Sequence, residues 1–179
     1  MIDLLLDRGA DVNMPSVRGE TPLHAAAALG RLTAVKTLLR RKANIEARDR
    51  YGLSPLGHAA VNGHTGMVEY LIGQAATLDA APGSHAPLGL AAANGHDAVI
   101  SLLAQHGATV DHTDAEGRTA LIVAAKRGKT TTVALLLKLG ANLHHTCNEG
   151  LTALKHAIKA GHTDIIALLQ AGHPAPRDH

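Results

Sequence analysis

The sequence predicts an all-α solenoid, a linear stack of short helix pairs rather than one closed core. Three observations support this fold class. Glycines that can end a helix recur at spacings of 33, 32, 33 and 33 residues, a period typical of stacked repeats. Apolar residues recur at helical spacing on both sides of each glycine. Each predicted helix is too short to be stable alone, so neighbouring units must cover its apolar side. The glycines are Gly30, Gly63, Gly95, Gly128 and Gly161.

The stretch from Gly19 to Asn44 shows one complete unit. Thr21 can accept a hydrogen bond from the free amides of a first helical turn, and Pro22 follows where a missing N–H costs nothing. We expect the first helix to stop at Gly30, which can adopt the left-handed conformation of a helix end. A second helix follows and should end near Lys42.

Leucine and alanine rows keep this register along the chain. Alanine at every repeat of a helix-facing position indicates backbones too close for a larger side chain. The first helices open with Leu23, Leu56, Leu88, Leu121 and Leu154 and continue with Ala26, Ala59, Ala91, Ala124 and Ala157. The second helices carry Leu5, Leu38, Leu71, Leu103, Leu136 and Leu168.

Five segments begin a repeat in the same way: TPLHAAA at 21–27, SPLGHAA at 54–60, APLGLAA at 86–92, TALIVAA at 119–125 and TALKHAI at 152–158. With the Gly–His pairs at 63–64, 95–96 and 161–162, they resemble the ankyrin repeat family. The resemblance implies antiparallel helix pairs joined by outward-pointing β-hairpin loops and stacked into a curved array. It also implies binding of other macromolecules on the hairpin tips and inner helix face, usually without catalysis.

We expect one ankyrin repeat domain over residues 1–173 and a mobile tail at 174–179. Residues 1–15 correspond to the second half of a repeat, and fuller repeats cover 16–48, 49–80, 81–113, 114–146 and 147–173. A half-repeat leaves apolar side chains uncovered. We therefore hypothesise that the chain is a piece of a longer array or self-associates through this end. The side chains concerned are Ile2, Leu4, Leu5 and Leu6.

The third repeat departs from the pattern. It is one residue shorter, with Ser84 where other repeats have a turn glycine and Ala86 in place of the capping hydroxyl. Just before it, Ala75 replaces the glycine that ends other second helices. Because a lost cap costs about 1 kcal/mol, we expect residues 73–86 to be the least stable part of the stack.

Composition argues against several classes of protein. No run approaches the roughly 18 apolar residues of a membrane helix, and the acidic start does not suit a signal peptide. The single cysteine, Cys147, fits a reducing compartment, so we expect a cytoplasmic or nuclear protein. The net charge of +2 is too small to predict a nucleic-acid partner.

No catalytic or cofactor motif is visible, so we predict a non-enzyme without a cofactor. Gly128-Lys129-Thr130 imitates the end of a phosphate-binding loop, but Val123 stands where that loop needs glycine. The thirteen histidines raise the question of a metal site. No structural-zinc spacing is present, so we predict none, and the question stays open for one cluster. That cluster is His112, His144, His145 and Cys147, whereas His24, His64, His96 and His162 match structural positions of the family.

Carried over by register, the family's contact positions fall on the hairpin tips and the ends of the first helices. Tyr51 is the obvious aromatic anchor there, and arginines such as Arg50 flank it, a composition that interfaces favour. The mixed charge suggests another protein or an acidic peptide as partner. The candidate binding residues are Arg18, Glu20, Arg50, Tyr51, Leu53, His85, Glu116, Arg118, Lys126, Arg127 and Glu149, with Val17, Asn62, Asn94, Asn148 and Leu151 at further contact positions.

These features predict a non-catalytic protein–protein interaction module with a rigid concave surface. One alternative is a structural spacer, or a fragment of a larger multidomain ankyrin protein. Another is an acidic-polymer binding protein that uses Arg48, Arg50, Arg118, Lys126 and Arg127. The basic run 40–42 has a simpler interpretation as solvated positive charge at a helix end.

Overall fold

The computed structural model describes residues 2–81 and 83–171, which form helices and turns with no residue assigned to a strand. The predicted mobile tail, 174–179, and the end of the last predicted repeat lie outside these residues. None of the described helices is long and apolar enough to cross a membrane. The helices are α1 (Ile2–Asp7), α2 (Pro22–Ala28), α3 (Leu32–Arg40), α4 (Pro55–Val61), α5 (Thr65–Gly73), α6 (Pro87–Asn94), α7 (Asp97–Gln105), α8 (Ala120–Lys126), α9 (Thr130–Lys138), α10 (Ala153–Ala160) and α11 (Thr163–Ala171).

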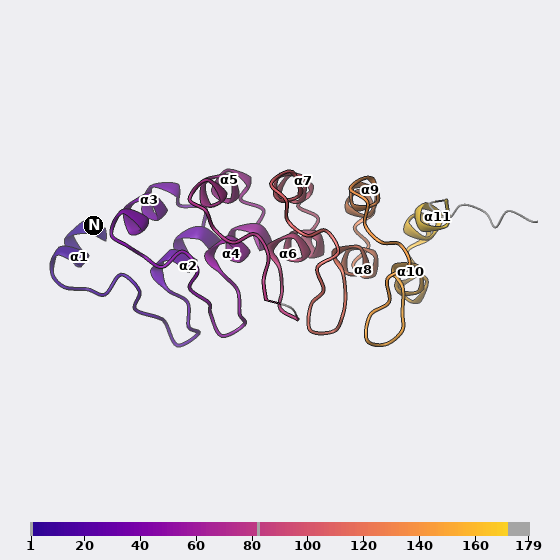
Figure 1. Ribbon diagram of the computed structural model, residues 1–179, viewed down its shortest axis with the longest axis horizontal. Coiled ribbons are helices and arrows are strands. Elements are labelled where there is room, and N and C mark those ends of the chain that lie inside the picture. Colours follow the sequence, from indigo (N-terminus) through magenta and orange to yellow (C-terminus); the bar gives the residue numbers. More distant parts are fainter. Residues whose placement is uncertain (1, 82, 172–179) are drawn as a thin grey trace, which may run out of the picture.

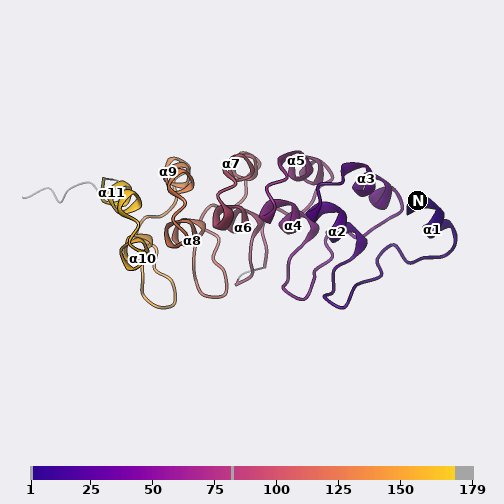
Figure 2. The same ribbon diagram turned by 180° about the vertical axis from the view of Figure 1, so that it is seen from behind.

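The helices form two rows along an elongated stack (Figure 1). Helices α2, α4, α6, α8 and α10 make the first row, and each contacts the next member of that row and the second helix of its own repeat. The loops between repeats all project from the side of the first row, which is also clear from behind (Figure 2). This is the helical solenoid that the repeat period predicts.

The core is a continuous strip of aliphatic side chains that follows the predicted rows. The five row alanines are buried, as are the leucines that open α2, α4, α6 and α8. The placement of Leu168 in the second-helix row is wrong. Leu169, 33 residues after Leu136, is fully buried, whereas Leu168 is half-buried. At the other end of the stack, Leu4 and Leu5 of α1 are 53% and 56% exposed.

At three of the repeats, the turn inside the repeat is held by a histidine of the following repeat, whereas the turn at Gly95 faces Lys129. The histidine Nε2–H donates to a carbonyl oxygen at the end of the preceding first helix, and its ring lies against the glycine of that turn. At Gly63 the backbone has φ of +72°, and an added Cβ would lie 2.6 Å from His96 Nδ1. Glycine is therefore needed both for the left-handed backbone and for the close approach. The donor–acceptor pairs are His64 with Ala28 O (2.8 Å), His96 with Val61 O (3.1 Å) and His162 with Lys126 O (3.3 Å).

The third repeat differs from the others in a way that the sequence predicts only in part. Ala86 lacks a capping side chain at the start of α6, and Ala75 adopts a left-handed φ of +62° after α5. Ser84 does not take the left-handed turn that glycine takes in other repeats; Gly83 adopts that conformation one residue earlier, with φ of +77°. Lys42 adopts the same left-handed conformation as Ala75, with φ of +64°, which is unfavourable for any residue with a side chain.

Replacing Gly63 by Ala is expected to lower the free energy of unfolding by about 1–3 kcal/mol, because the left-handed backbone becomes strained and the new Cβ meets His96. Gly66→Ala is the matched control, since an added Cβ at that helical position meets nothing within 4 Å. It should stabilise the protein by about 0.5–1 kcal/mol. Urea denaturation of both variants measures the effect, and equal stability would contradict the role given to Gly63.

Residues 73–86 are expected to unfold locally, and so to exchange their amide hydrogens, before the rest of the stack. The left-handed Ala75 and the uncapped start of α6 both weaken this segment. Mass spectrometry of deuterium uptake, read by peptide fragment, makes the measurement. Uniform protection from α4 to α8 would rule out a weak segment here.

Candidate functional site

The loop tips are joined to one another by backbone hydrogen bonds. Arg50 N–H donates to Arg18 O, and Asn148 N–H donates to Glu116 O, each at 3.0 Å. Within the second loop, Asp49 N–H donates to the carbonyl oxygen of Leu53 at 3.1 Å. The described loop residues form turns rather than assigned strands, so the β-hairpin in its detail stays a prediction. The first and second tips, and the fourth and fifth, are nevertheless held relative to each other.

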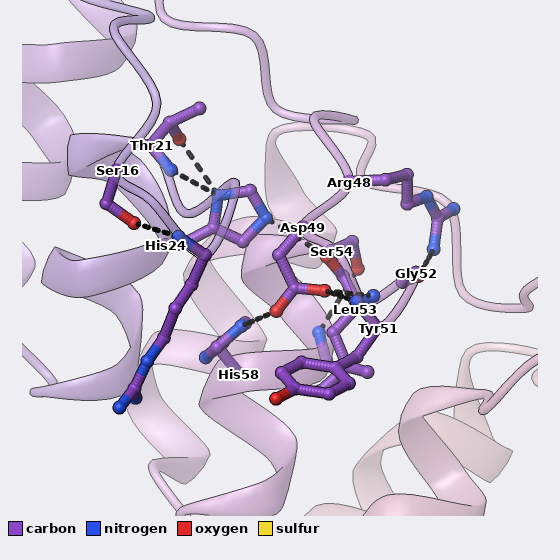
Figure 3. Close-up of polar contacts among 12 residues, drawn as sticks. Ser16, Thr21, His24, Arg48, Asp49, Tyr51, Gly52, Leu53, Ser54 and His58 are labelled. Atoms are coloured by element: carbon purple, nitrogen blue, oxygen red, sulfur yellow. Dashed lines mark hydrogen bonds and ion pairs between the residues drawn. The ribbon is translucent and has the colours of Figure 1, made fainter.

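A buried carboxylate organises the tip that carries Tyr51 (Figure 3). Asp49 Oδ1 accepts hydrogen bonds from the backbone N–H groups of Tyr51 (2.8 Å) and Leu53 (2.9 Å), and Oδ2 accepts from His58 Nε2 (2.8 Å). Burial alone would raise the pKa of Asp49, but these hydrogen bonds outweigh burial and hold its pKa below the usual value. The ionised carboxylate therefore fixes the backbone on both sides of Tyr51.

His24 ties this loop to the first helix of the preceding repeat. Its Nδ1 accepts from the backbone N–H of Thr21 (3.0 Å), and its Nε2–H donates to the carbonyl oxygen of Leu53 (3.0 Å). These contacts suit the neutral ring, and burial lowers the pKa of His24 below 6.5. The structural role predicted for His24 is confirmed.

In the fourth loop, a buried aspartate again holds the backbone, and its second oxygen pairs with an arginine instead of a histidine. Asp114 Oδ1 accepts from the backbone N–H groups of Glu116 (3.1 Å) and Arg118 (2.9 Å), and Oδ2 accepts from Arg118 Nε (2.8 Å). Burial alone would lower the pKa of Arg118, but the hydrogen bond to Asp114 raises it. Arg118 also donates to Glu116 Oε2 at 3.0 Å. Two predicted binding residues are thus engaged within their own loop.

The predicted binding residues do not gather into one cluster. Glu20, Leu53 and Arg118 are half-buried, and Tyr51 is 72% exposed on its tip. His85, Arg118 and Arg127 line one hollow between α6 and α8, whereas Tyr51 belongs to the tip before α4. The exposed members are Arg18, Arg50, Tyr51, His85, Glu116, Lys126, Arg127 and Glu149.

Sequence reasoning missed the residues that hold the tips, Asp49, His58 and Asp114. A signal was present, because Asp49 and Asp114 stand at the same register position, five residues before a first-helix N-cap. Cys147 occupies that position in the last loop, and its Sγ lies 3.6 Å from His156 Nε2. Recognising the pattern required the hydrogen bonds, since aspartate in a loop is common.

The histidine cluster considered for zinc has another use. His112 Nε2 donates to Ser84 O at 3.2 Å, and His145 Nε2 donates to Gly117 O at 2.9 Å. Within the described part of the chain, the side chains close enough to share an ion are Glu20, Asp49 and His58. None of these belongs to the histidine cluster, and Asp49 already accepts three hydrogen bonds. The geometry favours loop-to-loop hydrogen bonding for His112 and His145.

The basic run at the end of α3 contacts α1. Arg40 lies 3.2 Å from Asp3, and Arg41 pairs with Asp7. These arginines lie at the helix end in contact with solvent, as predicted, and they also form ion pairs that the prediction did not include. These ion pairs are exposed, so each contributes little stability, but together they place α1 against α3.

Acidification below pH 6.5 is expected to destabilise the fold through His24. A group whose pKa is lowered in the folded chain is protonated first in the unfolded chain, so its contribution is complete above 6.5 and falls below it. Burial, then the positive charge of Lys126, also lowers the pKa of His156, which adds the same sign. Asp49 contributes only at lower pH, because its lowered pKa starts from 3.8.

Urea denaturation at about pH 7 and about pH 5 measures this effect. Wild type should lose more stability between the two values than His24→Gln, whose side chain does not titrate. His85→Gln, which removes an exposed histidine, is the matched control and should lose as much as wild type. An equal loss in all three proteins would show that His24 is not the sensitive group.

Comparison with known proteins adds a family assignment. The sequence matches the model for ankyrin repeats (3 copies) over residues 1–82 and 88–175. Human protein fem-1 homolog A is 44% identical over 81 residues, or 45% of this chain and 12% of that protein. The mouse protein fem-1 homolog A-like is 50% identical over 68 residues, or 38% of this chain and 10% of that protein.

A third relative, human ankyrin repeat domain-containing protein 63, is 41% identical over 71 residues. The match covers 40% of this chain and 19% of that protein. The matched segments therefore span only a small part of each relative.

Proposed function

The chain belongs to the ankyrin repeat family, and on that premise we propose that it is a non-catalytic protein-interaction module. Its binding surface is formed by the loop tips and the exposed faces of the first helices. We further propose a single repeat domain over residues 1–173 and a cytoplasmic or nuclear location, where the thiol of Cys147 stays reduced.

The observation that carries this proposal is an exposed tyrosine on a tip that is already ordered. Tyr51 is 72% exposed, while the carboxylate of Asp49 holds its backbone N–H and that of Leu53. Ordering loops on binding costs affinity, and a loop held in advance avoids much of that cost. An aromatic side chain at such a place is the composition of an interface anchor.

The charges favour a protein partner over an acidic polymer. Of the arginines considered for polymer binding, Arg48 contacts Gly52 O (3.3 Å) and Glu46 (3.6 Å), and Arg118 is held by Asp114. Arg50, Lys126 and Arg127 remain without an ion pair among the described residues. Three separated positive charges suit a polar or acidic segment of a protein better than a continuous polyanion.

A pull-down from a lysate tests the proposal with the variant Arg18→Ala, Arg50→Ala, Tyr51→Ala. These side chains are exposed, so the fold should persist. The matched control removes three exposed side chains next to or on second helices, with Glu69→Ala, Gln74→Ala and Lys138→Ala. Wild type and control should retain a common partner that the tip variant loses by at least about tenfold, the loss expected for interface anchors.

Equal recovery by the tip variant would move the binding site to another face. If none of the proteins captured a partner reproducibly, the spacer role would be the better account. If instead the logarithm of the binding constant fell steeply and linearly with the logarithm of the salt concentration, the partner would be an acidic polymer.

A further inference from the structure

A hollow of about 220 Å³ lies between α6 and α8, beside the third and fourth loops. Its walls include Leu90 and Val123, with Arg118, Thr119 and Arg127 among its polar residues. The volume is below the roughly 300–1,000 Å³ of typical small-molecule sites. It equals the share of about seven liquid waters, at roughly 30 Å³ each, which leaves room for one amino-acid side chain together with water. The hollow therefore fits a side chain of a bound segment rather than a cofactor.

Gly89 lines the hollow and has no side chain to fill it. Gly89 is the third residue of α6, where α2 has His24, α4 has Gly57 and α8 has Ile122. A Cβ added at Gly89 would meet no atom within 4 Å. Its backbone is not left-handed, since no positive φ is present there. Glycine is thus required neither by the backbone nor by a neighbour, although it is less favourable than alanine inside a helix.

The polar groups of the hollow leave a positive charge without a partner. Asp114 is matched by Arg118, whose Nη2 lies 2.8 Å from Oδ2 of that carboxylate. Arg127 is exposed and has no ion pair among the described residues, so the lining carries a net positive charge at neutral pH. His85 and His112 are the other titratable groups of the lining, and His112 is bonded to Ser84 O.

Thr119 adds a second, independent feature. Its side chain is fully buried, and its Oγ1 has no hydrogen-bond partner among the described residues. In α2 the equivalent Thr21 contacts Nδ1 of His24 at 2.9 Å, but Ile122 stands at that place in α8. Leaving a buried hydroxyl without a hydrogen-bond partner is unfavourable. A ligand oxygen in the hollow is a partner that the chain itself does not supply.

We propose that this hollow is a pocket for a glutamate side chain of an acidic peptide segment bound across the first helices. The proposal rests on the proposed interaction function and names one contact within it. The two methylenes of glutamate lie against Leu90 and Val123, and the carboxylate accepts hydrogen bonds from the Arg127 guanidinium and the Thr119 hydroxyl. Aspartate, one methylene shorter, reaches less far past the apolar walls. The site selects charge and side-chain length together.

Selection from a display library of random 12-residue peptides tests the pocket. Peptides enriched on wild type should share a glutamate at a fixed position, and synthetic Glu→Gln versions should bind at least about tenfold more weakly, because a charge-assisted hydrogen bond is lost. Gly89→Leu fills the hollow and should bind the glutamate peptide at least about tenfold more weakly than wild type. Arg127→Gln keeps the shape and should bind the Glu and Gln peptides equally.

Gly66→Leu is the matched control, since it changes another helical glycine with open space around it, on the second helix α5. It should bind both peptides like wild type, and circular dichroism of every variant should show the same helical content. Peptides without a shared glutamate, or a glutamate peptide unaffected by Gly89→Leu, would overturn the pocket while leaving the interaction surface intact. If wild type enriched no peptide but still captured a lysate partner that the tip variant loses, only the pocket proposal would be overturned. Failure of both experiments would overturn both proposals.

Discussion

Close packing between consecutive repeats is the constraint on which the stack depends, and at three junctions it includes a hydrogen bond from a histidine to a carbonyl oxygen of the repeat before it. A helix of seven to nine residues gains too little from its own hydrogen bonds to form alone. Its stability comes from packing against the neighbouring repeat. His96 and Gly63 show how close that contact is, since one methyl group more on the glycine would enter the ring.

The loops use the same principle with charge in place of an aromatic ring. Asp49 and Asp114 are buried, ionised and satisfied by backbone N–H groups, so each tip keeps its shape without a partner. Neighbouring tips are then joined through Arg50 and Arg18. A surface prepared in this way binds with little loss of conformational freedom, which is the physical basis for regarding it as an interaction surface.

Departures from the repeat pattern are where this chain differs from an ideal array. Gly89 and Ile122 together remove the side chain and the hydrogen-bond partner that α2 provides with His24. A hollow lies there, beside a buried hydroxyl and an unpaired arginine. The third loop is altered as well, with Gly83 rather than Ser84 taking the left-handed turn. Irregular positions are therefore found in and next to the third repeat, and also at Lys42 in the first fuller repeat.

The amino-acid sequence by itself determined the family, the helical stack, the row of buried alanines and the structural histidines. Those properties follow from the local periodicity of the sequence and from steric limits that are the same in every repeat. Only the tertiary structure decided which polar residues are free. Arg118 and Arg127 look alike in sequence, yet Asp114 holds the first and leaves the second unpaired. It also decided that Leu169 rather than Leu168 enters the core, and that Gly89 lines a hollow whereas Gly63 prevents a collision. The burial of a side chain and its ion pairs depend on the adjacent repeat, about 33 residues away along the chain. A local sequence pattern therefore does not predict them.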